Sequence, residues 1–127
     1  MHGKAGRKGW RGARRTMRML EPAIMLLMHC SPAHGYSLLE DLQKFGLGNI
    51  DPSLLYRALH QMEQRGWINS DWDKEQSQGP PRRVYHLTAE GDAVLSTIIQ
   101  DLQVQQENVQ KLMDSYQKHM QDCTSDF

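Results

Sequence analysis

DPSLLYRALHQMEQRG, residues 51–66, is the most informative segment of this chain, because it contains the start, the buried face and the end of one predicted helix. Asp51 is a good N-cap, since its carboxylate can accept backbone N–H groups that have no partner within the helix. Pro52 falls on the first helical position, where its missing N–H costs nothing. Gly66 stands where a left-handed C-terminal cap is expected. Helical periodicity places four apolar residues on one face, namely Leu55, Ala58, Leu59 and Met62.

The opposite face of this helix is polar and poor in acids. It carries Ser53, Tyr56, Arg57, His60, Gln61 and Gln64. These side chains can hydrogen-bond to phosphates or to base edges. Any amphipathic helix has a polar outside face, however, so the helix alone leaves a purely solvated surface as an equal alternative.

The segments before it predict two further helices. Residues 19–28 are apolar almost all round, which favours a central core helix, and residues 31–35 interrupt it. Residues 36–45 show helical spacing again and end at a Gly-rich segment, 46–49. Gly35 is expected to permit a tight turn, with His34 or Tyr36 capping or packing beside it. Three helices joined by short turns, the third with a polar outer face, match a helix-turn-helix unit.

The spacing of the apolar residues changes after Gly66 from a helical to an alternating pattern. Residues 67–72 alternate roughly as an edge strand does, residues 73–81 form a turn, and residues 82–87 are interpreted as the returning strand. A β-hairpin directly after the third helix is the wing of a winged helix. Arg82 and Arg83 lie just past its tip, where a wing would meet a phosphate backbone.

The last predicted helix begins after Thr88, a plausible N-cap, and runs to about residue 120. Its apolar residues follow heptad spacing, interrupted at Gln105: Leu95, Ile98, Leu102, Val109, Leu112 and Tyr116. So long a helix cannot bury its far half against so small a body. This predicts a coiled-coil homodimer, and the alternative is a helix that folds back on the first helix of its own chain.

The charge distribution is uneven although the formal net charge of the 127 residues is zero. The first eighteen residues carry seven Lys and Arg and no acid. This basic, Gly-rich arm, which includes Arg14 and Arg15, suits a polyanion, with a solubilising leader as the equal alternative.

The sequence gives little support to other functional classes, such as metal or redox proteins, membrane proteins and enzymes. The two cysteines are far apart, which excludes a CxxC-type metal or redox site and favours a reduced, cytoplasmic setting. We expect no metal and no cofactor. No apolar run is long enough to span a membrane. The serines lack an evident base and no Gly-rich phosphate loop follows a strand, so an enzyme is not predicted.

Three blocks in this order carry a family resemblance: HGYSLLEDL (34–42), DPSLLYRALHQMEQRGWI (51–68) and GPPRRVYHLTAEGDAVL (79–95). Over roughly residues 19–95 the chain resembles the PadR-type transcriptional regulators. The resemblance implies a winged helix-turn-helix dimer that binds an operator, usually represses, and in some members responds to an aromatic or hydrophobic effector. Family members often carry a small hydroxyl residue in place of Leu54 and proline in place of Arg57. The operator sequence therefore cannot be transferred from relatives.

These observations combine into one expectation: a mainly α chain with a small β-hairpin. Its parts are a flexible basic arm (1–17), a winged helix-turn-helix domain (18–88), a dimerisation helix (89–120) and a disordered tail (121–127). Double-stranded DNA is the expected partner. Tyr56, Arg82 and Arg83 are assigned to phosphates, Arg14 and Arg15 to a minor groove, and the major groove is assigned to Ser53, Leu54, Arg57, His60 and Gln61.

Two further expectations concern other partners. A small hydrophobic effector could be lined by Met17, Met19, Leu20, Tyr116 and Met120, although core packing explains these residues at least as well. The rival function is a winged-helix protein-interaction module, which would use the same core to bind protein rather than specific DNA.

Overall fold

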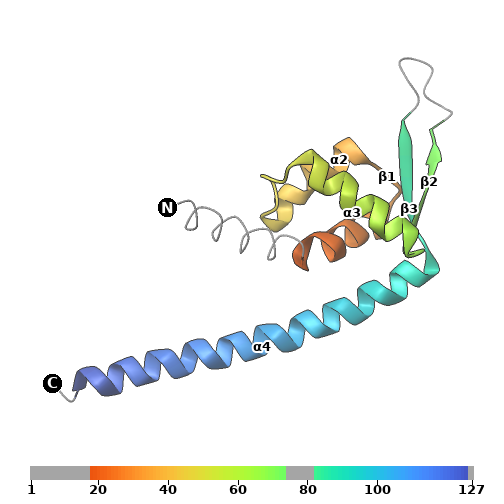
Figure 1. Ribbon diagram of the computed structural model, residues 1–127. Coiled ribbons are helices and arrows are strands. Elements are labelled where there is room, and N and C mark those ends of the chain that lie inside the picture. The colour runs from red at the N-terminus through yellow and green to blue at the C-terminus, as the bar shows by residue number, and fades with distance from the viewer. Residues whose placement is uncertain (1–17, 74–81, 126–127) are drawn as a thin grey trace. The chain divides into compact units, whose positions relative to one another are not determined.

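The computed structural model describes residues 18–73 and 82–125. Residues 18–30 are helical. They are followed by β1 (Ala33–His34), α2 (Gly35–Asp41), the 3-10 helix η1 (Leu42–Phe45), α3 (Pro52–Gln64), β2 (Ile68–Trp72), β3 (Arg83–Leu87) and α4 (Ala89–Ser125). The predicted fold class, mainly helical with a small β-hairpin and a long last helix, is confirmed (Figure 1). The predicted arm, with Arg14 and Arg15, and most of the predicted turn at 73–81 lie outside the described residues.

The chain divides into two compact units, one ending at Leu95 and one beginning at Ser96. The first unit therefore includes the start of α4, rather than stopping at residue 88 as the sequence suggested. Helix α4 also continues past residue 120, where the predicted tail begins, and reaches Ser125. Residues 121–125 contain neither Gly nor Pro, so no local signal ends the helix there.

Helix α3 has the caps that its sequence predicts. The Ser53 N–H donates to Asp51 Oδ1 over 2.9 Å, and Pro52 is the first helical residue. At the other end Gly66 has a φ of 81°, which its lack of a Cβ permits. The N–H groups of Gly66 and Trp67 donate back to the carbonyls of Glu63 and Met62, which closes a Schellman motif.

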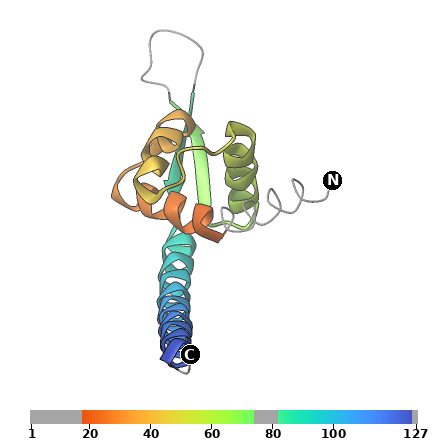
Figure 2. The same cartoon turned by 90° about the vertical axis from the view of Figure 1, so that its left-hand side faces the viewer.

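The sheet is antiparallel and has three strands in the order β1-β3-β2. The hairpin pairs Ile68 with Leu87 and Trp72 with Arg83. Strand β1 was not predicted, because it consists of only two residues, whose partners Tyr85 and Val84 lie far along the chain. In Figures 1 and 2 the helices of the first unit lie together beside the base of the hairpin.

The region between β1 and α3 differs from prediction in two respects. The single helix expected over residues 36–45 is a short α-helix followed by a 3-10 turn. Gly35 also does not provide the backbone freedom that was expected of it. Among the described residues only Gly46 and Gly66 have positive φ. The reason for a glycine at position 35 is a close side-chain approach, which belongs to the functional site.

The core of the first unit is apolar throughout. Its largest side chains with less than 2% exposure are Leu20, Ile24, Met25, Leu38, Leu42, Leu55, Leu59, Met62 and Ile68. The four predicted apolar residues of α3 are all buried. Since one face of α3 is fixed in this core, its opposite face is held outward as part of a rigid surface.

Candidate nucleic-acid interface

The outward face of α3 presents most of the predicted groove-reading side chains to solvent. Ser53, Tyr56, Arg57 and His60 are exposed, whereas Leu54 and Gln61 are half-buried. Arg57 makes no hydrogen bond or ion pair to any described residue, so its guanidinium keeps all five donors for a ligand. This surface offers cationic, hydroxyl and imidazole groups on one rigid helix.

Beside this face lies a cleft of about 680 Å³, which we term the tyrosine cleft. It is lined by residues of β1, α2, α3 and β3 and of the segment before β3: His34, Gly35, Tyr36, Tyr56, Arg82, Arg83 and Tyr85. Three phenol rings and two guanidinium groups therefore surround one concave surface. Such a set can hold an anion by charge and by hydroxyl donors, and can pack against a flat or sugar-like group.

One wall of the tyrosine cleft is a stack of three side chains. The rings of His34 and Tyr36 are stacked with centroids 5.2 Å apart. The Arg82 Cζ lies 4.8 Å from the centroid of the Tyr36 ring. This cation–π contact holds the Arg82 side chain over α2, although Arg82 itself belongs to the segment before β3.

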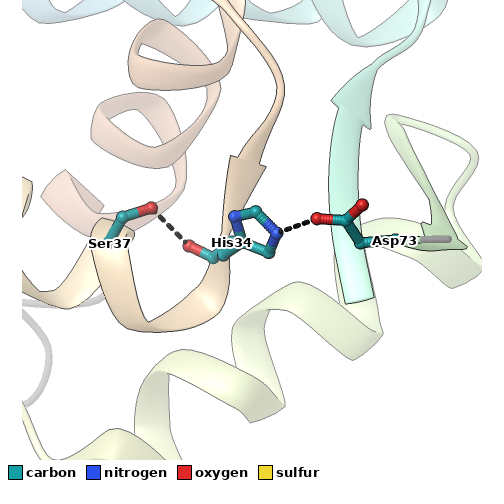
Figure 3. Close-up of polar contacts among 3 residues, drawn as sticks. All are labelled: His34, Ser37 and Asp73. Carbon is teal, nitrogen blue, oxygen red and sulfur yellow. Dashed lines mark hydrogen bonds and ion pairs between the residues drawn. The ribbon is translucent and has the colours of Figure 1, made fainter. Parts of the chain in front are cut away.

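His34 also contacts the end of β2. Its Nε2 lies 3.1 Å from Asp73 Oδ2, and both side chains are about one-quarter exposed (Figure 3). On the other side, Ser37 Oγ donates to the His34 carbonyl over 2.9 Å. The Asp73 N–H donates to the Arg82 carbonyl over 2.7 Å. Residues from β1 and α2 thus hold both ends of the hairpin loop near the cleft.

A second wall depends on Gly35. A Cβ at this position would lie 2.6 Å from the Tyr56 hydroxyl oxygen and 2.7 Å from the ring carbon Cε1. The absence of a side chain therefore lets the Tyr56 ring lie directly against the start of α2. This contact fixes where the phenol of α3 enters the cleft.

Arg83, the second arginine of the tyrosine cleft, is held by neighbours on β2. Arg83 Nη1 donates to Ser70 Oγ over 2.8 Å, and its Cζ lies 4.8 Å from the Trp72 ring centroid. Ser70 Oγ in turn donates to Glu63 Oε2 of α3 over 2.8 Å. Both predicted wing cations are therefore ordered by aromatic contacts rather than extended freely into solvent.

Tyr85 forms the floor of the cleft and is 6% exposed. Burial raises the pKa of its phenol above the ordinary value of 10.0, Arg83 acts against this shift, and Glu63 and Tyr56 add to it. The phenol is therefore neutral over the physiological range and remains a hydrogen-bond donor.

The sequence pointed to Tyr56, Arg82 and Arg83 but missed the other cleft residues as a site. Tyr36 was interpreted only as a core or capping residue, and Tyr85 only as a strand residue. Their proximity depends on β1 pairing with β3, for which no local pattern existed. The signal that could have found them is the recurrence of Tyr in each block, at positions 36, 56 and 85, with Arg beside it in the second and third blocks.

The second unit is one helical segment with a broad apolar face. Of the predicted dimerisation residues, Val109, Leu112 and Tyr116 are 53%, 71% and 63% exposed, and Ile98 and Leu102 are half-buried. Leu95 is only 6% exposed in the single chain, so it has little surface left for a partner. Further exposed apolar residues on the same side are Ile99, Met113 and Met120.

A three-helix unit whose third helix presents a polar face, followed by a hairpin with cationic side chains at the loop end of its strands, defines a winged helix-turn-helix DNA-binding protein. Residues 24–97 match the model of the PadR-like family of transcriptional regulators. The chain belongs to this family, and it is a DNA-binding transcription regulator rather than an enzyme.

Solved structures support the same assignment. The chain is similar to a PadR-like transcription factor from Bacteroides fragilis, with 30% identity, a TM-score of 0.65, and coverage of 80% of this chain and 98% of that one. It is also similar to a PadR-like transcriptional regulator from Bacillus cereus (26% identity, TM-score 0.69, coverage 79% and 96%). A PadR family regulator from Eggerthella lenta is 28% identical, with a TM-score of 0.64 and coverage of 88% and 94%. No curated protein matches this sequence.

Two other findings concern the described part of the chain, residues 18–73 and 82–125. No helix there is both long and apolar enough to cross a membrane. Nor does that part of the chain gather three or more His, Cys, Asp or Glu side chains in a group that could hold a metal ion.

Proposed function

We propose that this protein represses transcription as a cytoplasmic homodimer bound to a near-palindromic operator. The observation that carries the proposal is that the outward face of α3 and the tyrosine cleft lie next to each other and share Tyr56. Helix α3 enters the major groove with Ser53, Arg57 and His60, while Leu54 and Gln61 contact the groove edge. The cleft takes the adjoining phosphate backbone through Tyr56, Arg82 and Arg83.

The two sets of residues have different roles in this proposal. Arg57 has a solvated guanidinium that can donate two parallel hydrogen bonds to a guanine edge. Arg82 and Arg83 are fixed at the cleft and meet phosphates, which carry no sequence information. The predicted arm residues Arg14 and Arg15 add a minor-groove contact.

A direct test is fluorescence anisotropy with labelled DNA from upstream of the protein's own gene, against a shuffled duplex, across a salt series. Arg57→Ala should reduce the preference for the operator, because a base contact is lost. Arg83→Ala should weaken both duplexes alike and reduce the salt slope by about one. Equal losses on both duplexes for both variants would contradict this division.

The homodimer is supported by the exposed apolar side of residues 96–125. With about 100° between successive residues, Leu102, Val109 and Tyr116 form one row, flanked by a row with Leu112 and a row with Met113 and Met120. This stripe is wider than the two-residue seam of a simple coiled coil and suits a bundle with more than one neighbouring helix.

The oligomer can be tested by sedimentation equilibrium. Leu112→Asp should shift the protein to monomer, because it places a charge in the buried interface. Gln100→Asp adds the same charge on the opposite side of the helix and should leave the dimer intact. A wild-type monomer at micromolar concentration would refute the homodimer.

An effector that releases DNA completes the proposal. Leu20 is fully buried in the core, Met17 lies outside the described residues and Met19 belongs to the first unit, so the candidate contacts on the second unit are Tyr116 and Met120, which are both more than 40% exposed. An apolar or aromatic compound that binds them should raise the melting temperature and weaken operator binding. If the chain binds no labelled duplex even at low salt, the proposal is wrong and the rival function, a protein-interaction module, is favoured.

A further inference from the structure

The Arg83 side chain is restrained although its residue is exposed. One nitrogen donates to Ser70 Oγ over 2.8 Å, and the guanidinium carbon lies 4.8 Å from the Trp72 ring centroid. Both partners belong to β2, the strand next to β3 in the sheet. A free arginine samples many rotamers, and fixing it on binding reduces affinity. Here the side chain is already fixed before any ligand arrives.

Ser70 connects this cation to the groove-facing helix. Its hydroxyl has one proton, which it donates to Glu63 Oε2 over 2.8 Å, so its oxygen is left to accept from Arg83. Glu63 is half-buried in the last turn of α3. The chain of hydrogen bonds Arg83–Ser70–Glu63 therefore runs from β3 through β2 to α3.

This arrangement places a negative charge beside a surface that must attract phosphates. A half-buried carboxylate close to a DNA-facing arginine lowers the local positive potential, which by itself would weaken binding. Its geometry supplies a compensating effect, since the polarised Ser70 hydroxyl is a better acceptor for the guanidinium. The Glu63 carboxylate thus fixes the orientation of the Arg83 guanidinium and does not add to the electrostatic attraction for phosphate.

We propose that Ser70 and Glu63 are positioning residues that hold Arg83 at a fixed place relative to α3, so that the wing and the helix bind DNA at a fixed spacing from each other. This inference rests on the proposed function, in which Arg83 meets a phosphate. The phosphate that Arg83 selects is then set by the register of α3 in the major groove, and the wing cannot slide along the backbone independently.

The test is a double-mutant cycle on operator affinity, measured by anisotropy at fixed salt. Ser70→Ala removes the connection while leaving the charge, and it should weaken binding by roughly 3- to 10-fold, the range for an arginine that loses its pre-organisation. In an Arg83→Ala background the same change should have no further effect, because the side chain that it positions is gone. Ser70→Thr restores the hydroxyl and should recover affinity to within about twofold of wild type.

Matched variants separate this role from a loss of folding. Asn69→Ala alters the neighbouring exposed residue of β2 and should bind as wild type does. Glu63→Gln keeps an acceptor for Ser70 and removes a negative charge, so its affinity should equal or exceed that of wild type. Glu63→Ala should weaken binding as Ser70→Ala does.

The outcomes distinguish the two proposals. If Ser70→Ala has no effect, or if its effect adds in full to that of Arg83→Ala, the positioning role is wrong while the DNA-binding proposal stands. If the wild-type chain itself fails to prefer the operator, the proposed function fails before the cycle begins. A loss of affinity confined to the background that retains Arg83 supports the inference.

Discussion

Gly91→Ala is expected to destabilise the protein strongly, although it replaces a glycine by the best helix former. Gly91 lies in the first turn of α4, and a Cβ there would be 2.0 Å from the Trp67 carbonyl oxygen and 2.7 Å from Leu87 Cδ1. Real Cβ atoms essentially never approach closer than 3.0 Å, so the backbone at Trp67 would have to move by about 1 Å. That oxygen accepts from the Thr88 N–H over 3.1 Å, and it shares the Thr88 hydroxyl proton, over 2.9 Å, with the Gly66 carbonyl oxygen at 2.7 Å.

The size of the effect follows from three terms. Overpacking costs about 1–3 kcal/mol, and each weakened hydrogen bond costs about 0.5–1.5 kcal/mol. Alanine returns only about 1 kcal/mol of helix propensity. With two weakened hydrogen bonds these terms sum to a fall of roughly 1–5 kcal/mol in the free energy of unfolding, and the middle value of about 3 kcal/mol lowers Tm by about 12–24 °C for a unit of this size.

The assay is thermal and urea unfolding followed by far-ultraviolet circular dichroism, at equal protein concentration for each variant. Gly48→Ala is the control, since the atoms nearest its added Cβ belong to the exposed side chain of Gln43, which can turn aside. We expect it to change stability by less than about 1 kcal/mol. Should Gly91→Ala unfold at the wild-type temperature or above it, the close contact between α4 and Trp67 is refuted.

Two other substitutions probe the tyrosine cleft. Gly35→Ala should displace the Tyr56 ring, whose atoms lie 2.6–2.9 Å from the added Cβ. We expect DNA binding, measured by anisotropy, to weaken by about tenfold with little change in fold. An unchanged affinity would mean that the position of the ring does not matter for binding. Burial favours the neutral Tyr85 phenol by raising its pKa, so stability is full below the ordinary value of 10.0 and is lost as pH rises beyond it. Tyr85→Phe should reduce that loss in urea unfolding at pH 8 and pH 10.5, and an identical pH dependence in both proteins would contradict the buried phenol.

Local sequence signals predicted the elements of this protein well. Helix α3 has the boundaries that Asp51, Pro52 and Gly66 indicate, because capping depends on a few adjacent backbone groups. Thr88 likewise begins α4, since its hydroxyl accepts the Gly91 N–H over 3.0 Å. Signals of this kind involve residues within one helical turn.

The candidate site was only partly predictable, because its contacts join residues that are far apart in the sequence. The two residues of β1 carry no strand pattern, so the approach of His34 to Asp73, 39 positions later, could not be inferred. Periodicity also assigned no role to Glu63, since helical spacing does not show which strand residue contacts it. The tertiary pairing of β1 with β3 and the packing of β2 against α3 supply this missing information.

The shortness of β1 has a mechanical consequence. Only Ser31 and Pro32 separate the first helix from this strand, and the strand is hydrogen-bonded to the wing through the Val84–Tyr85 pair. A displacement of the first helix, whose Leu20, Ile24 and Met25 are part of the core, is therefore passed to the hairpin both through the core and through the main chain and the β1–β3 pairing. A partner that displaces this helix is therefore expected to change the tilt of the wing.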